Sequence, residues 1–145
     1  TEQVNEIGDK IRELGHEYGT TTKRPRRCGW LDLVALNYAV MVNGLTGIAL
    51  NHLDTIGKLD KIKLCVAYKY KGKETTDFRT NLEFLQNSEA VYEEFDGNFG
   101  DISNCKTYEE LPENARKYIE RIEELTGTPV KFIGTGAARE NIIVR

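Results

Sequence analysis

The sequence has few of the features that mark membrane, disulfide-rich or metal-binding proteins. Its 145 residues include no apolar run near the ~18 residues that a membrane-spanning helix needs. It opens without the charged and then apolar leader of a secreted protein, so we expect no secretory signal. The three cysteines, Cys28, Cys65 and Cys105, form no C-x-x-C pair, which argues against a disulfide framework and a zinc site. The two histidines, His16 and His52, offer little for a histidine-based metal site. We therefore expect reduced thiols in a cytoplasm, no membrane contact and no metal site in these residues.

An excess of positive charge is also lacking. Lys plus Arg number 20 and Asp plus Glu number 23, which gives a net charge of −3 with neutral histidines. This balance argues against a globally cationic nucleic-acid binder, although a local basic patch remains open. The length and the 39% hydrophobic content suit one globular domain with a substantial core. The chain begins at Thr1, without an initiator methionine and within a charged helical pattern, which indicates a piece cut from a longer protein.

Helical periodicity alternates with short apolar runs along the chain. The apolar spacing predicts helices over residues 4–14, 32–43 and 112–125, with Asp32 as a cap and Gly44 and Gly127 beyond two helix ends. The short run at residues 47–50 reads as a strand buried on both faces. Further strands are predicted for residues 62–70, 74–77, 90–95, 130–133 and 141–144. This alternation favours an α/β layered fold.

The most unusual stretch is a loop that we call the threonine–arginine loop, residues 20–27. Three hydroxyl residues precede four cations, in the order Thr20, Thr21, Thr22, Lys23, Arg24, Pro25, Arg26 and Arg27. Threonine hydroxyls form single hydrogen bonds and arginine grips carboxylates or phosphates with a planar fork, so the loop suits a small anion with several oxygens. A solvated basic loop, a nuclear-localisation-like run or a nucleic-acid contact would also fit this composition.

A carboxylate follows the apolar run at residues 47–50, in the turn Asn51-His52-Leu53-Asp54. A carboxylate in that place can accept hydrogen bonds from the ring N–H and the exocyclic amine of guanine, a pair of donors that adenine lacks. An aspartate after a strand is also a common turn former or helix cap. Both interpretations of Asp54 stay open on these four residues alone.

The last two predicted strands are joined by Gly134-Thr135-Gly136. This turn lacks the further glycine and the following helix that a dinucleotide-binding fingerprint requires. A tight turn is the simplest interpretation. Because glycine has no Cβ, the backbone there could also approach a planar base closely.

Together these segments resemble the adenylosuccinate synthetase family, the IMP–aspartate ligases of purine synthesis. The most specific match is residues 15–32, GHEYGTTTKRPRRCGWLD. Further matches in the same order are LNHLD at 50–54, KLCVAY at 63–68, YIERIEELTG at 118–127 and GTG at 134–136. The resemblance spans nearly the whole chain and about the C-terminal third of the family's usual length. It implies a single C-terminal domain over residues 1–145, part of a P-loop-like, mainly parallel layered α/β fold.

The resemblance also implies roles for individual residues. The family uses GTP to form 6-phosphoryl-IMP, and the amino group of L-aspartate then displaces the phosphate to give adenylosuccinate. The loop residues Thr20, Thr21, Thr22, Lys23, Arg24, Pro25 and Arg26 would hold aspartate, and Arg24 would also reach the IMP ribose. GTP would be bound by Arg26, near its phosphates, by Asp54 reading guanine beside His52 and Leu53, and by a pocket wall of Gly134, Thr135 and Gly136.

This chain departs from the family pattern at three of these positions and at Ala137, next to the glycine turn. Lys23 stands where glycine is common, His52 replaces a lysine whose stem packs on the base, and Gly134 and Ala137 replace a serine and a proline. We hypothesise that the His52 imidazole stacks on guanine instead. We expect these changes to affect how tightly GTP binds more than whether GTP is the nucleotide.

The family's phosphate loop, with its G-D-E-G-K-G pattern, has no counterpart in these residues. The resemblance places the catalytic aspartate and histidine, the Mg²⁺ ligands and a subunit-contacting arginine of the homodimer upstream as well. We therefore predict that the 145-residue chain alone is inactive, with no catalytic residue or metal ligand of its own. The alternative is a noncatalytic module that binds a nucleotide or anion.

Overall fold

The computed structural model describes all residues from Thr1 to Arg145. The helices are α1 (Glu6–Leu14), α2 (Leu33–Asn43), α3 (Leu53–Ile56), α4 (Leu82–Asn87) and α5 (Glu113–Thr126), with a 3₁₀ turn at Tyr108–Glu110. The strands are β1 (Leu31–Asp32), β2 (Ile48–Leu50), β3 (Lys61–Tyr70), β4 (Lys73–Thr75), β5 (Glu89–Asp96), β6 (Val130–Gly134) and β7 (Ile142–Val144). None of these helices has the length and apolarity needed to cross a membrane.

The predicted helix ends are confirmed by their caps. The Asp32 carboxylate accepts a hydrogen bond from the Ala35 amide at 3.0 Å, which satisfies one of the free donors at the start of α2. Gly44 and Gly127 follow α2 and α5 with φ of 59° and 60°, the left-handed conformation that favours glycine. The short helices α3 and α4 were not predicted, because four and six residues are too few to show helical periodicity.

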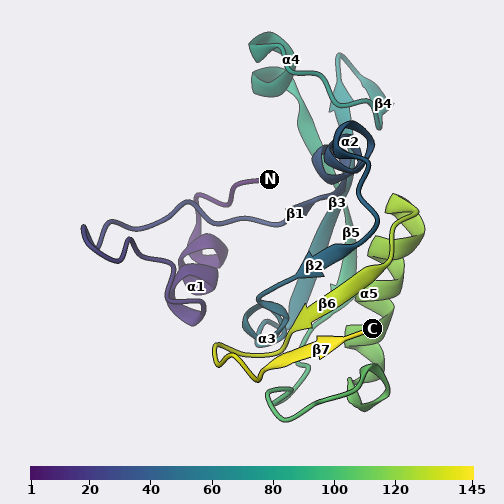
Figure 1. The fold of residues 1–145 in the computed structure, drawn as a ribbon. Helices are drawn as coiled ribbons and strands as arrows, with labels where there is room; N and C mark the ends of the chain where they lie inside the picture. The colour runs from purple at the N-terminus through teal and green to yellow at the C-terminus, as the bar shows by residue number, and fades with distance from the viewer.

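The strands form two sheets (Figure 1). The long strand β3 pairs in parallel with β1 and antiparallel with β4 and β5, while β6 pairs in parallel with β2 and antiparallel with β7. The α/β class is confirmed. Parallel pairing is less dominant than expected, since only two of the five strand pairs are parallel. The short connections, such as the two-residue turn at Lys71-Gly72, allow only antiparallel pairing.

Burial in β2 alternates, which differs from the predicted strand buried on both faces. Ile48 is buried and the next residue, Ala49, is exposed. Alternate residues of a strand point to opposite faces of the sheet, so this pattern means that β2 is covered on one face in this chain. The expectation of burial on both faces is therefore wrong.

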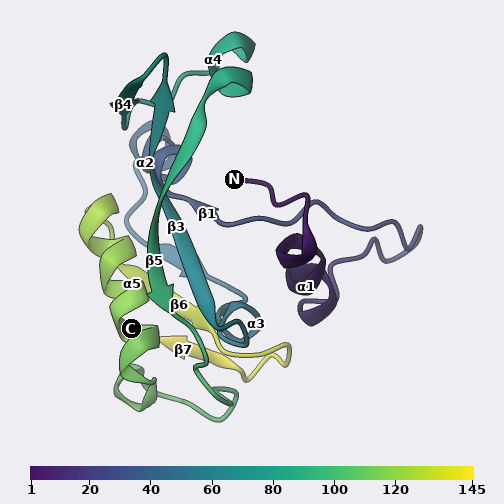
Figure 2. The same ribbon diagram turned by 180° about the vertical axis from the view of Figure 1, so that it is seen from behind.

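The main core lies between α5 and the two sheets (Figure 2). Its buried residues include Ala115, Ile119 and Ile122 of α5, Ile62 and Leu64 of β3, Val130 and Ile133 of β6, Ile143 of β7, Ile48 of β2 and Leu53 of α3. A smaller cluster of Val34, Cys65, Tyr68 and Phe84 joins α2 to the far end of β3 and to α4. The first cluster fixes the ends of β2 and β6, and these ends carry the candidate site.

We expect the substitution Ile133→Ala to lower the free energy of unfolding by about 3 kcal/mol, because it opens a cavity beneath the end of β6. Ile133 is fully buried, whereas Ile142 on the adjacent strand is 42% exposed. Ile142→Ala is therefore the matched control, with an expected loss below about 1 kcal/mol. Urea denaturation of the chain and its two variants measures both. Equal losses for the two would contradict this account of the core.

Candidate functional site

Two of the sequence-predicted site segments follow parallel strands that are neighbours in one sheet. Because β2 and β6 are parallel, their carboxyl ends lie at the same edge. The turn Asn51–Asp54 leaves the end of β2, and the turn Gly134–Ala137 leaves the end of β6. The crevice outside the carboxyl ends of parallel strands is the usual ligand site of α/β proteins.

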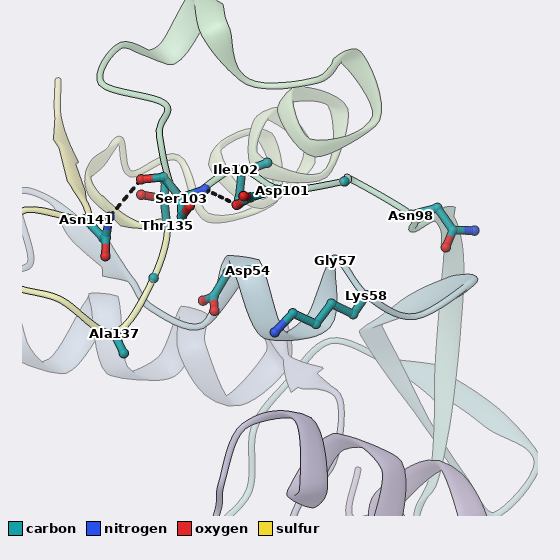
Figure 3. A pocket seen from close by; sticks show the side chains of 12 residues that line it. Asp54, Gly57, Lys58, Asn98, Asp101, Ile102, Ser103, Thr135, Ala137 and Asn141 are labelled. Carbon is teal, nitrogen blue, oxygen red and sulfur yellow. Dashed lines mark hydrogen bonds between the residues drawn. The ribbon is translucent and has the colours of Figure 1, made fainter.

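A cavity of about 720 Å³ opens at this edge (Figure 3). Asp54 and Lys58 lie on one side of it, and Ser103, Thr135 and Asn141 lie on the other. A second cavity of about 520 Å³ is lined by residues that include His16, Asn51 and His52. The residues that line both cavities are Asp54, Lys58, Gly136 and Ala137. Either volume falls within the range of small-molecule sites, roughly 300–1,000 Å³.

The side chain of Asp54 lies at the cavity and has no partner within the chain. Asp54 lies in the first turn of α3, next to Leu53, whose side chain is fully buried in the core. The half-buried Asp54 carboxylate forms no hydrogen bond or ion pair with another residue of the chain, and it lines both cavities. Its oxygens are therefore free to accept hydrogen bonds from a ligand.

The glycine turn opposite Asp54 is fixed by Asn141. The Asn141 side-chain oxygen accepts from the Ala138 amide at 3.1 Å, and its side-chain nitrogen donates to the Ser103 carbonyl at 2.7 Å. A Cβ on Gly136 would lie 2.8 Å from that Asn141 oxygen, so a larger residue there would displace the Asn141 side chain from its two hydrogen bonds. This explains the second glycine of the predicted turn by close packing. The buried hydroxyl of Thr135, also in this turn, has no hydrogen-bond partner.

His52 begins α3 in the left-handed conformation, with φ of 61°. Its exposed imidazole turns toward Glu17, and its Nε2 lies 3.5 Å from a Glu17 carboxylate oxygen. The side chain therefore lies at the rim of the second cavity, beside the segment that enters the threonine–arginine loop. Its stacking on a base stays a prediction.

The threonine–arginine loop extends away from both sheets (Figure 1), and every residue from Thr20 to Arg27 is exposed. Backbone hydrogen bonds close its tip: the Gly19 amide donates to the Arg24 carbonyl at 2.9 Å, and the Lys23 amide donates to Gly19 at 2.8 Å. Lys23 adopts φ of 54°, a left-handed conformation that glycine adopts with less strain. The Arg24 guanidinium and the Thr20 and Thr21 hydroxyls form no hydrogen bond or ion pair with another residue, so these groups stay available to a ligand.

Glu17 connects the base of this loop to the cavity side. One of its carboxylate oxygens lies 3.0 Å from Arg26 Nη1, and the other is the oxygen near His52. Arg12 adds a second tie, because its Nε donates to the Arg26 carbonyl at 2.8 Å. Arg26 itself lines neither cavity. The structure therefore brings the predicted aspartate loop and the predicted guanine turn together through Glu17.

We expect Glu17→Gln to loosen the loop without unfolding the chain. The ion pair with Arg26 is partly exposed, so its loss costs less than about 1 kcal/mol of stability. Amide hydrogen exchange in residues 19–26 is expected to rise several-fold, measured by mass spectrometry. Glu124→Gln, which removes a similar exposed pair with Arg121, is the control and leaves this loop unchanged. Unchanged exchange in both variants would show that Glu17 does not hold the loop.

Several cavity residues were missed from the sequence. The segment 98–103 contributes Asn98, Asp101 and Ser103 to the wall of the larger cavity. It has no helix or strand periodicity, and its shape depends on a local turn in which the Ser103 amide donates to the Asp101 carboxylate at 2.9 Å. The Asp-x-Ser spacing is the one signal that could have marked this turn. Lys58 belongs to no sequence motif.

The remaining reactive side chains do not form a site. All three cysteines are free thiols, and burial raises the pKa of Cys65 to about 11, so this thiol stays protonated and unreactive. The structure contains no group of three or more His, Cys, Asp or Glu side chains that could hold a metal ion.

The fold and the cavity define a class of protein: an α/β protein with a polar ligand site at the carboxyl ends of parallel strands. Comparison with known sequences narrows this class, because the sequence model of the adenylosuccinate synthetase family matches residues 1–143. The chain belongs to the adenylosuccinate synthetase family.

Individual relatives agree with this assignment. The chain is 65% identical to the adenylosuccinate synthetase of Acetivibrio thermocellus and 56% identical to that of Caldicellulosiruptor bescii, covering 99% and 100% of this chain. It spans only about a third (34%) of the length of either relative. A fully ligated adenylosuccinate synthetase from Plasmodium falciparum matches the fold with a TM-score of 0.93 and 46% identity, over 100% of this chain and 35% of that one.

Proposed function

We propose that this chain is the C-terminal part of a GTP-dependent ligase that joins IMP and L-aspartate, and that it supplies the guanine-reading and aspartate-binding elements. The observation that carries the proposal is the free Asp54 carboxylate beneath the glycine turn, at a cavity of the size of a small ligand. The free hydroxyl and guanidinium groups of the threonine–arginine loop supply a second site, which would bind an anion. The membership of the chain in the family supports both assignments.

In the proposed reaction, an IMP oxygen attacks the γ-phosphate of GTP, which releases GDP and forms 6-phosphoryl-IMP. The amino group of aspartate then attacks C6 of the purine, and inorganic phosphate leaves. Asp54 selects guanine by accepting from its N1–H and its 2-amino group. Arg24 holds an aspartate carboxylate and reaches the IMP ribose, and the Thr21 and Thr22 hydroxyls orient the same carboxylates. Arg26 lies toward the GTP phosphates. The contribution of these residues is positioning and charge stabilisation.

The exposed apolar residues of β6 and β7 support the proposal that this chain is part of a longer enzyme. Phe132, Ile142 and Val144 are exposed on these two adjacent strands, with 43%, 42% and 65% of their surfaces accessible. Neighbouring apolar side chains of this size commonly mark a surface that another protein segment covers. We propose that the rest of a family-length enzyme covers it and brings Mg²⁺, the phosphate loop and the catalytic residues, and that this enzyme is a cytoplasmic homodimer.

The test is an enzyme of full family length, made by joining this chain to the preceding two-thirds of the Acetivibrio thermocellus relative. We call it the full-length chimera. It is expected to form adenylosuccinate from IMP, aspartate and GTP, whereas the 145-residue chain alone forms none. Chromatography of the products measures both. Two results together would favour the noncatalytic nucleotide-binding module instead: a chimera that folds but is inactive, and a 145-residue chain that still binds GDP on its own.

A further inference from the structure

Lys58 is a cationic side chain at the predicted guanine site that no role assigned above uses. It lies four residues after Asp54, just past the end of α3. Both residues line the larger cavity (Figure 3), and both also line the second one. An aspartate and a lysine at this spacing commonly form an ion pair. Here the chain leaves α3 at Gly57, and no nitrogen–oxygen distance between the two groups is within the 4.0 Å of a salt bridge.

The ammonium group of Lys58 has no other partner in the chain. It forms no hydrogen bond and no ion pair, although Asp101 lies on the same cavity wall. The pKa of Asp101 is lowered mainly by its hydrogen bonds to Ser103 and only slightly by the charge of Lys58, so the two are near but not paired. Arginine is absent from the lining of both cavities, and His52 turns toward Glu17. Lys58 is therefore the free cation at the site.

A guanine base presents two kinds of group along one edge. Its N1–H and 2-amino group are donors, which the Asp54 carboxylate can accept, and its O6 is an acceptor that needs a donor. Lysine is a common partner of guanine O6 and N7 in nucleic-acid recognition. The Asp54 carboxylate and the Lys58 ammonium group are both free and both line one cavity. The carboxylate could therefore accept from the two guanine donors while the ammonium group donates to O6.

We propose that Lys58 donates a hydrogen bond to guanine O6 and acts with Asp54 as a second specificity-determining residue for the nucleotide. This inference rests on the proposed function, since it needs a guanine nucleotide in the cavity. It also bears on the family pattern, in which a lysine usually stands at position 52. That lysine packs its stem on the face of the base, whereas Lys58 would contact the base edge, so the two roles are different.

The experiment compares Lys58→Met with the unmodified full-length chimera, using GTP and its analogues. The methionine side chain keeps the unbranched shape of the lysine stem and removes the charge and the donors. We expect KM for GTP to rise about tenfold with kcat within twofold, the effect of one charge-assisted hydrogen bond at a partly exposed site. The unmodified chimera should prefer GTP to 6-thio-GTP about tenfold, because sulfur is a weak acceptor. Lys58→Met should reduce that preference to about twofold.

Three controls separate the possible outcomes. Lys58→Arg keeps the charge and the donors and should hold KM for GTP within threefold, and Lys73→Met removes an exposed lysine on β4 without effect. With 7-deaza-GTP, which lacks N7 and keeps O6, Lys58→Met should show the same tenfold rise as with GTP. An active chimera whose 6-thio-GTP preference is unchanged in Lys58→Met overturns this inference alone. A folded chimera that makes no adenylosuccinate overturns the proposed function.

Discussion

Replacing Asp54 with asparagine in the full-length chimera is expected to lower kcat/KM for GTP about 100-fold or more and to shift preference toward xanthosine triphosphate. In the proposed site the carboxylate accepts two hydrogen bonds from guanine, and bonds to a charged group contribute roughly 1.5–3 kcal/mol each. The asparagine amide instead donates to the 2-carbonyl of xanthine and accepts from its N1–H. Because the Asp54 side chain has no partner within the chain, its replacement leaves the fold intact.

Steady-state kinetics with the two nucleotides measures this switch. Asp77→Asn is the matched control, since Asp77 is an exposed aspartate between β4 and α4 and lines neither cavity. The control is expected to leave both nucleotide preferences unchanged. A variant Asp54→Asn that keeps its full preference for GTP would show that another group reads the base.

Replacing Arg24 with leucine is expected to raise KM for aspartate about 100-fold and to change KM for GTP less than threefold. The guanidinium is exposed at the tip of the threonine–arginine loop and forms no ion pair within the chain, and in the proposed function it holds a carboxylate of aspartate. Loss of a paired carboxylate contact costs roughly 2–5 kcal/mol when the other charge is left without a partner. Initial rates at varied aspartate and fixed saturating GTP and IMP measure the change.

Arg27 offers a control within the same loop. Its guanidinium pairs with Glu2 and is not assigned to a substrate. Arg27→Leu is therefore expected to leave KM for aspartate within twofold. If both arginine variants raise this KM equally, the effect belongs to the net charge of the loop, and the specific assignment of Arg24 fails.

The elements that could be predicted from the sequence are those whose ends carry local signals. Asp32 and Gly44 bound α2, Gly127 ends α5, and the alternation of β3 marked nearly its full length. The helices α3 and α4 gave no such signal because they are shorter than two helical turns. The parallel pairing of β2 with β6 depends on contacts about eighty residues apart, which no local pattern encodes.

The candidate site divides in the same way. Asp54 and the glycine turn could be predicted because each follows a recognisable strand, and the structure places them around shared cavities. Glu17 could not be assigned, because its contacts with Arg26 and His52 depend on how the loop folds back. Lys58 was missed because a single lysine near a helix end is ordinary in sequence, and its significance comes from the lack of any partner.

The most direct test of the central claim is an experimental structure of the full-length chimera with GDP, IMP and succinate, an aspartate analogue without the amino group. The account predicts guanine in the cavity between Asp54 and the Gly134–Ala137 turn, with O6 toward Lys58, and a succinate carboxylate on Arg24. Guanine bound elsewhere, with residues 20–26 directed into solvent, would contradict the account.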